Sequence, residues 1–229
     1  STQTGGGRTG GGSGSTGGGS GSTGGGSGST GGGTASNGGG SSTAAPGLVI
    51  NEVDYDQPLS DNAEFVELLN TSSSNESLAW VSVCLINGSN GTLYNQVALD
   101  SFGSLAPGEY FVIASDRVIQ SLPSGVRSTT FGTSMATDNL QNGAPDGVAL
   151  VRNNTTIIDS LSYEGETVWD AGSPLGKVTI QEGTASTLLL ADSNSDAGSL
   201  SRLPNGIDTN VNASDFVFTP NVTPGLPNQ

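Results

Sequence analysis

The side chains best suited to chemistry in this sequence are the carboxylates that follow its first apolar stretch. Asp54, Asp56, Asp61 and Glu64 are grouped in one short segment, LVINEVDYDQPLSDNAE. Ca²⁺ prefers several carboxylate and carbonyl oxygens in one flexible site. The segment is therefore a candidate calcium site. The favoured interpretation is a solvated acidic turn in which Asp and Asn side chains cap backbone amides.

Two further acidic segments resemble calcium loops less closely. The stretch DSNSDAG (192–198) places acidic or amide side chains at the first, third and fifth positions of a DxDxDG loop. However, Ala197 stands where that loop needs glycine, and Leu203 stands where it needs a bidentate glutamate. We therefore expect a polar turn there, and we expect the same for DTNVNASD (208–215).

Catalytic arrangements find little support in the residue types present. The chain has no histidine, which excludes Ser-His and Cys-His catalysis. Cys84 lies in an apolar stretch and is expected to be a buried, inert thiol. Glu164 and Glu166 lie near Trp169, as a glycosidase with a sugar platform would require, but a surface loop is the favoured interpretation. Lys177 has no neighbouring motif for a Ser-Lys dyad. The prediction is that the protein is not an enzyme.

The charge of the chain excludes two classes of partner. The formal net charge is −15, and Lys177 is the single lysine. The arginines are scattered: Arg8, Arg117, Arg127, Arg152 and Arg202. Nucleic acids and anionic membranes both require clustered cations, so neither is expected as a partner. No apolar run approaches the ~20 residues of a membrane-spanning helix.

Residues 1–46 form a Gly/Ser/Thr-rich arm with a period of seven. TGGGSGS occurs three times without change, at 9–15, 16–22 and 23–29, and two degenerate copies follow. Glycine lets backbones approach closely enough to pair their N–H and C=O groups between chains. The arm is therefore expected to be an assembly element; the alternative is a flexible spacer. The assembly contacts are assigned to the triplets Gly10, Gly11, Gly12, Gly17, Gly18, Gly19, Gly24, Gly25, Gly26, Gly31, Gly32 and Gly33.

The elements that must position the candidate residues are strands within a domain at 47–229. Alternating or continuous apolar residues between turn signals predict roughly nine short strands. NGSNG (87–91) and Asn153-Asn154 are strong turn signals between them. This pattern indicates an all-β sandwich. The predicted strands are 48–53, 63–70, 78–86, 92–99, 105–114, 146–152, 155–163, 186–191 and 199–203.

Several separated segments carry a resemblance to a known family. LVINEVDYDQP…DNAEFVELLN, LAPGEYFVIA, DNLQNGAPDGVALV, IDSLSYEG and SLSRLPNGIDTNVNASDFVFTPNVTPGLPN together resemble a bacterial lamin-tail domain over about 48–228. The resemblance implies an immunoglobulin-like β-sandwich without catalytic residues, found in secreted or surface proteins. No heptad pattern is present, so the lamin rod is not implied.

The expected location is extracellular or on the cell surface. The chain begins at Ser1, which we interpret as a mature protein whose signal peptide has been removed. Low lysine, few cysteines and abundant Asp, Asn and Thr are typical of bacterial extracellular proteins.

The predicted function is that of a non-enzymatic extracellular structural protein. It would be a subunit of a bacterial surface filament or lattice, a homo-oligomer or polymer assembled through the arm. The first alternative is an adhesion or ligand-binding module on a flexible spacer, with a carbohydrate or other surface ligand. The second is an accessory domain of a secreted hydrolase. No cofactor is expected, and calcium is the one candidate.

Overall fold

The computed structural model describes residues 47–133 and 136–229. The arm (1–46), with the glycines predicted to mediate assembly, lies outside the described residues. The described residues all fall within one compact unit, Gly39–Gln229. The architecture below is therefore that of the domain predicted at 47–229.

The larger sheet has six strands in the order β14-β13-β1-β2-β7-β8. Neighbouring strands are antiparallel except for β7 and β8, which are parallel and joined through the short helix α1 (Asp116–Ser121). Strand β1 lies inside the sheet, between β2 and β13. The strand bounds are Leu48–Asp54 for β1, Phe65–Asn70 for β2, Tyr110–Ala114 for β7, Arg127–Thr130 for β8, Ser199–Arg202 for β13 and Phe216–Thr219 for β14.

The second sheet has four antiparallel strands in the order β10-β9-β4-β5. Their bounds are Val81–Asn87 for β4, Thr92–Ala98 for β5, Asp146–Arg152 for β9 and Thr156–Tyr163 for β10. Two small sheets and two short helical turns complete the described residues. These are β3 (Glu76–Ser77) with β6 (Ser104–Leu105), β11 (Val168–Asp170) with β12 (Lys177–Thr179), η1 (Asp100–Phe102) and α2 (Asn212–Asp215).

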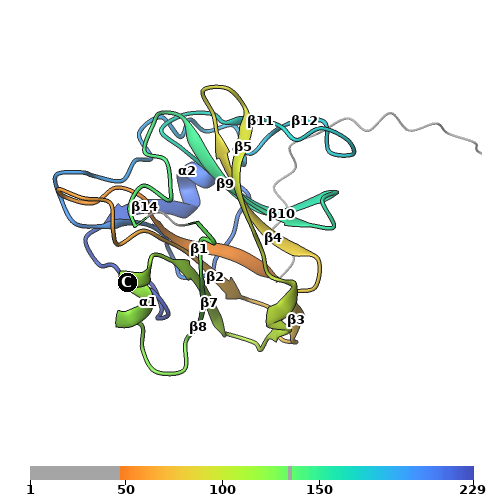
Figure 1. The fold of residues 1–229 in the computed structure, drawn as a ribbon. Coiled ribbons are helices and arrows are strands. Elements are labelled where there is room, and N and C mark those ends of the chain that lie inside the picture. Colours follow the sequence, from red (N-terminus) through yellow and green to blue (C-terminus); the bar gives the residue numbers. More distant parts are fainter. Residues whose placement is uncertain (1–46, 134–135) are drawn as a thin grey trace, which may run out of the picture. The chain divides into compact units, whose positions relative to one another are not determined.

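The two main sheets pack face to face, as Figure 1 shows, and enclose the hydrophobic core. Ile50 and Leu68 from the larger sheet and Val83 and Leu150 from the smaller one belong to the same buried cluster. Successive side chains of a strand point to opposite faces, so alternate residues reach this core. The predicted all-β sandwich is confirmed.

A second apolar cluster covers part of the outer face of the four-stranded sheet. Cys84 and Ile86 of β4 pack there against Trp169 and Ile180, which belong to the β11–β12 region. The approach is close, because a Cβ placed on Gly147 would lie 2.4 Å from the Cδ1 atom of Ile180. Cys84 is buried as predicted, and burial raises the pKa of its thiol to about 12.

Most predicted strands and turns are found where the sequence placed them. Asn153 and Asn154 both have a φ of 55°, as the tight turn between β9 and β10 requires. The prediction of a strand at 186–191 is wrong, because this segment forms a turn in which Leu188 and Leu189 are exposed. The predicted strand 78–86 begins only at Val81. Strand β14 was not predicted.

Candidate functional site

The residues predicted to bind calcium lie at the end of β1 and in the loop before β2. The Asp54 carboxylate accepts a hydrogen bond of 2.6 Å from Gln57 Nε2, and Asp61 Oδ1 accepts one of 2.9 Å from Gln57 N. Glu64 is buried, and its two carboxylate oxygens accept hydrogen bonds from the backbone amides of Asn139 and Leu140. Glu64 therefore holds a distant loop in place.

These four carboxylates do not form a cluster within the described residues. No three of the residues Asp54, Asp56, Asp61 and Glu64 bring carboxylate oxygens within 4.8 Å of one another. The geometry adds no support for calcium at these four residues, and the calcium site stays a prediction.

The charge that acts most strongly on Asp54 is that of Asp192, which lies in the segment 192–198 expected to be a polar turn. Burial, followed by the charge of Asp192, raises the pKa of Asp54 to about 9. Burial also raises the pKa of Asp192, to about 7, although hydrogen bonds from the amides of Tyr55, Ser193 and Asp56 lower it. Two acidic groups this close favour a state in which one of them is protonated. The segment 192–198 thus binds back to the end of β1.

The most extensive charged network surrounds Arg202 of β13, whose side chain is fully buried. Its Nη2 donates to both oxygens of Asp159, at 2.9 and 3.2 Å, and its Nη1 donates to Asp208 and Asp215, each at 3.1 Å. Its Nε donates to the carbonyl of Ile50. The guanidinium also lies over the ring of Phe216, 4.5 Å from the centroid. One arginine therefore joins β1, β10, β13 and the segment 208–215.

Acidic groups outnumber the positive charge in this network. Carboxylate oxygens of Asp159, Glu182 and Asp208 lie within 4.8 Å of one another, the single such group among the described residues. Burial and the charge of Asp159 raise the pKa of Glu182 to about 10, while Arg202 lowers it. Glu182 also accepts hydrogen bonds from Ser160 N and Asn212 Nδ2. Each of these groups has partners within the fold, so we assign the network a structural role.

The two tryptophans lie in opposite environments. Trp169, expected beside Glu164 and Glu166, is 5 % exposed and packs in the outer cluster with Cys84. It therefore offers no sugar platform. The exposed indole is that of Trp80, which is 70 % exposed and directly precedes β4.

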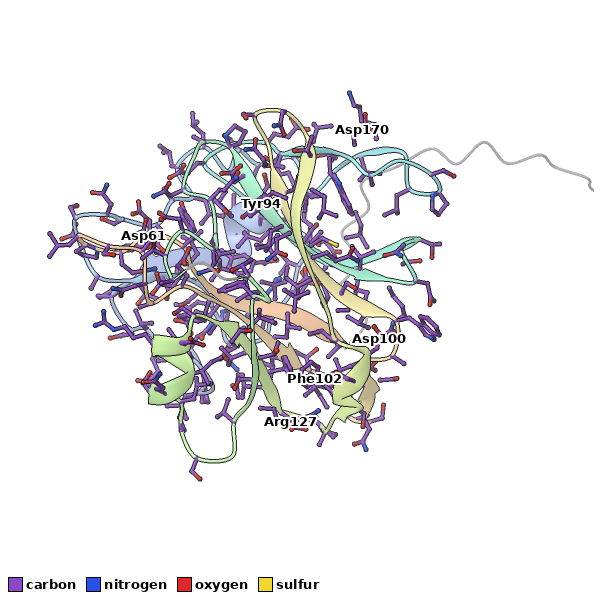
Figure 2. The ribbon with its side chains drawn as sticks, viewed as in Figure 1. Asp61, Tyr94, Asp100, Phe102, Arg127 and Asp170 are labelled. Carbon is purple, nitrogen blue, oxygen red and sulfur yellow. The ribbon has the colours of Figure 1, made fainter. Side chains whose placement is uncertain are left out.

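Trp80 borders a groove of about 480 Å³ on the part of the four-stranded sheet that the β11–β12 region leaves open. Its floor comes from Ser82 and Ala98, which are cross-strand partners on β4 and β5. Asp100 lies on the right of the molecule in Figure 2 and Asp61 on the left, so the groove is far from the acidic loop. The lining residues are Trp80, Ser82, Gln96, Ala98, Asp100, Asn153 and Asn154.

The groove combines one exposed aromatic ring with amide, hydroxyl and carboxylate groups. Such side chains both donate and accept hydrogen bonds, whereas an indole offers an apolar face. None of the described lining residues is a nucleophile paired with a base. This arrangement can bind a ligand that has both an apolar face and hydroxyl or amide groups.

The fold defines an all-β domain of the immunoglobulin-like sandwich class. The chain belongs to the Lamin Tail Domain family, whose model matches residues 41–165. The predicted resemblance is therefore confirmed, although β13 and β14 lie beyond the matched range. A search of curated proteins finds no match. No helix among the described residues is long and apolar enough to cross a bilayer.

Proposed function

We propose that this protein is a non-enzymatic extracellular structural protein whose glycine-rich arm joins subunits into a filament or lattice at a bacterial surface. The observation that carries the proposal is the exact TGGGSGS repeat at 9–29, which two degenerate copies extend to residue 43, shortly before strand β1. A spacer requires only a composition, whereas identical copies allow every repeat to make the same contact.

The energetics of the arm require many such contacts. Ordering a backbone costs about 1–2 kcal/mol per residue, so a single contact between arms does not suffice. The three glycines of each copy present neighbouring N–H and C=O groups with no side chain between them, a surface suited to main-chain pairing. The rest of the chain is strongly acidic and repels its own copies. The repeats at 9–43 carry no charged side chain and are therefore the favourable place for contact.

The place where the arm joins the domain also suits a structural role. Strand β1 is hydrogen-bonded to β2 on one side and to β13 on the other. Ile50 N donates to Asp159 Oδ2, and Asn228 Nδ2 donates to the carbonyl of Asn51. Tension applied through the arm therefore acts on a strand held from several directions, which an assembled subunit requires.

The proposal is tested by replacing the middle glycine of each triplet, Gly11, Gly18, Gly25 and Gly32, with valine. The added side chains prevent close approach of the backbones, so assembly measured by light scattering should be lost while the circular dichroism of the sandwich is retained. The matched control replaces Thr9, Thr16, Thr23 and Thr30 with valine, which is isosteric with threonine. Assembly of both variants alike would overturn the proposal.

A second candidate function is a ligand-binding module that the arm holds away from an anchor. The observation that favours it is the groove at Trp80, because an exposed indole beside polar side chains is a recognition surface. This function is compatible with assembly, since the groove and the arm involve different residues.

A further inference from the structure

We propose that the groove bordered by Trp80 binds a saccharide chain, with the indole as the platform for a sugar ring. The inference rests on the second candidate function and is independent of assembly through the arm. Five features carry it: the backbone conformation of Trp80, the exposure of its ring, the small residues of the floor, the polar rim and the charge of the groove.

The backbone of Trp80 has a conformation that does not suit its side chain. Its φ is +61°, in the left-handed region, which is strained for a bulky residue. The backbone is held there from two sides, since Trp80 N donates to Asp100 Oδ1 at 2.7 Å and Asn153 N donates to the Trp80 carbonyl at 2.8 Å. Glycine would satisfy the same hydrogen bonds without strain. The fold thus requires the conformation at this position but gains little from the indole.

The exposure of the ring leads to the same conclusion. A tryptophan side chain stabilises a fold by removing its large apolar area from water. Trp80 leaves 70 % of its surface accessible, so much of that gain is absent. The held backbone nevertheless fixes where this side chain leaves the chain, at the edge of the groove. A tryptophan side chain has only two rotatable bonds, so it loses little entropy when a ligand binds to its ring.

The floor of the groove leaves room for a flat ring beside the indole. Ser82 and Ala98 lie opposite each other on β4 and β5, and both are small. Cys84 and Ile86, the next outward-facing residues of β4, belong to the cluster that the β11–β12 region covers. A pyranose ring has an apolar face formed by its C–H groups, and this face can stack on an indole while its edge stays polar.

The rim supplies groups that match the edge of a sugar. Gln96, Asn153 and Asn154 contribute amides, and Asp100 contributes a carboxylate. A sugar hydroxyl donates one hydrogen bond and accepts others, so amides and carboxylates are complementary to it. The rim is also partly preorganised, because Gln96 Nε2 donates to Asn154 Oδ1 at 3.3 Å.

Charge and polarity favour a saccharide over other ligands that stack on tryptophan. Single-stranded nucleic acid needs cations along its backbone, but the described lining residues include no Lys or Arg, and Asp100 is acidic. An apolar peptide would need a larger apolar floor than Ala98 offers. A neutral polysaccharide requires neither cations nor a large apolar floor.

The test measures retention of the full-length protein on insoluble cellulose, chitin, xylan, mannan and starch. At least one of these should retain the protein. The Trp80→Gly variant should bind that polysaccharide at least about tenfold more weakly, as expected for loss of a central aromatic contact. Its melting temperature should stay equal or rise, because glycine relieves the backbone strain.

The matched control is Leu59→Gly. Like Trp80, Leu59 is exposed and has a positive φ, of 82°, but it does not line the groove. This variant should bind as the unchanged protein does. Retention on none of the five polysaccharides, or equal retention of the Trp80→Gly variant, would overturn the proposal. Sedimentation of the same variants reports on assembly separately, so failure of saccharide binding is distinguishable from failure of the arm to assemble subunits.

Discussion

At the residue scale, the described structure depends on one buried cation. Arg202 has three acidic hydrogen-bond partners, Asp159, Asp208 and Asp215. Its removal leaves these carboxylates without a compensating charge in the interior. Breaking a buried ion pair by removing one partner costs about 3–5 kcal/mol.

The Arg202→Met variant should therefore lose about 3–5 kcal/mol of unfolding free energy, measured by urea denaturation. Arg202→Lys should lose less, because it keeps the charge while giving up the planar set of donors. Arg117→Met, which removes an exposed arginine bonded to Asn62, is the control and should change little. A stable Arg202→Met variant would show that the network contributes little to the fold.

The carboxyl pair of Asp54 and Asp192 predicts how stability depends on pH. The pKa of Asp54 is raised from 3.8 to about 9 in the folded protein, so the folded state binds this proton more tightly than the unfolded state does. The contribution of this proton to the free energy of unfolding is fully present below about pH 3.8 and is lost as the pH rises through about 9. Glu67 and Glu182, whose pKa values are raised to about 8 and about 10, act in the same direction. The melting temperature should fall between pH 5 and pH 9.

Replacement of Asp54 by asparagine should reduce that fall, because the amide cannot ionise and can donate a hydrogen bond to Asp192. The measurement is the melting temperature of the Asp54→Asn variant at both pH values. Asp116→Asn removes the same charge from an exposed residue of helix α1 and should leave the fall unchanged. An identical pH dependence in all three proteins would refute the assignment of a shared proton.

At the scale of elements, the segment after β12 packs closely against the four-stranded sheet because position 147 of that sheet is a glycine. A Cβ on Gly147 would lie 2.4 Å from Ile180 Cδ1 and 2.8 Å from the carbonyl oxygen of Leu161. The Gly147→Ala variant should therefore lose about 1–3 kcal/mol of stability, measured by urea denaturation. In Gly143→Ala the added atom meets only Asp146 Oδ2, at 3.6 Å, so this control should be nearly neutral. Equal stabilities would mean that the segment docks loosely.

The sequence predicted those elements whose signals are local. Asn153 and Asn154 mark their turn because few residues tolerate a positive φ, and the apolar stretch around Cys84 is indeed an inner strand of its sheet. The run Leu188–Leu190 wrongly predicted a strand, because consecutive leucines are typical of buried strands. In the structure these residues lie in a turn, and only Leu190 of the three is buried. The neighbours of Trp80 favour strands, so the predicted strand 78–86 includes this residue.

The polar networks could not be predicted from local sequence patterns, because their members come from distant parts of the chain. Arg202 and Asp159 are far apart in the sequence, and only the pairing of β1 with β13 and the packing of the two sheets bring them together. The same holds for Asp54 and Asp192. The candidate groove also depends on which part of the outer sheet face the β11–β12 region leaves uncovered, and no single segment carries that information.

At the scale of the whole molecule, the sequence divides into the domain at 47–229 and the glycine-rich arm. The hydrophobic core and the described polar networks lie within residues 47–229. The fragment 47–229 should therefore give a β-type circular dichroism spectrum and a cooperative thermal transition close to that of the full chain. A fragment that is unfolded or melts without cooperativity would show that the arm belongs to the folding unit.

The central claim, assembly through an exact repeat, is tested most directly by scrambling residues 9–43 at fixed composition. Sedimentation velocity and electron microscopy would compare the scrambled chain with the native one. The account predicts filaments or large oligomers for the native chain and monomers for the scrambled chain, with the same circular dichroism of the sandwich. A scrambled chain that assembles as the native chain does, or a native chain that stays monomeric, would contradict it.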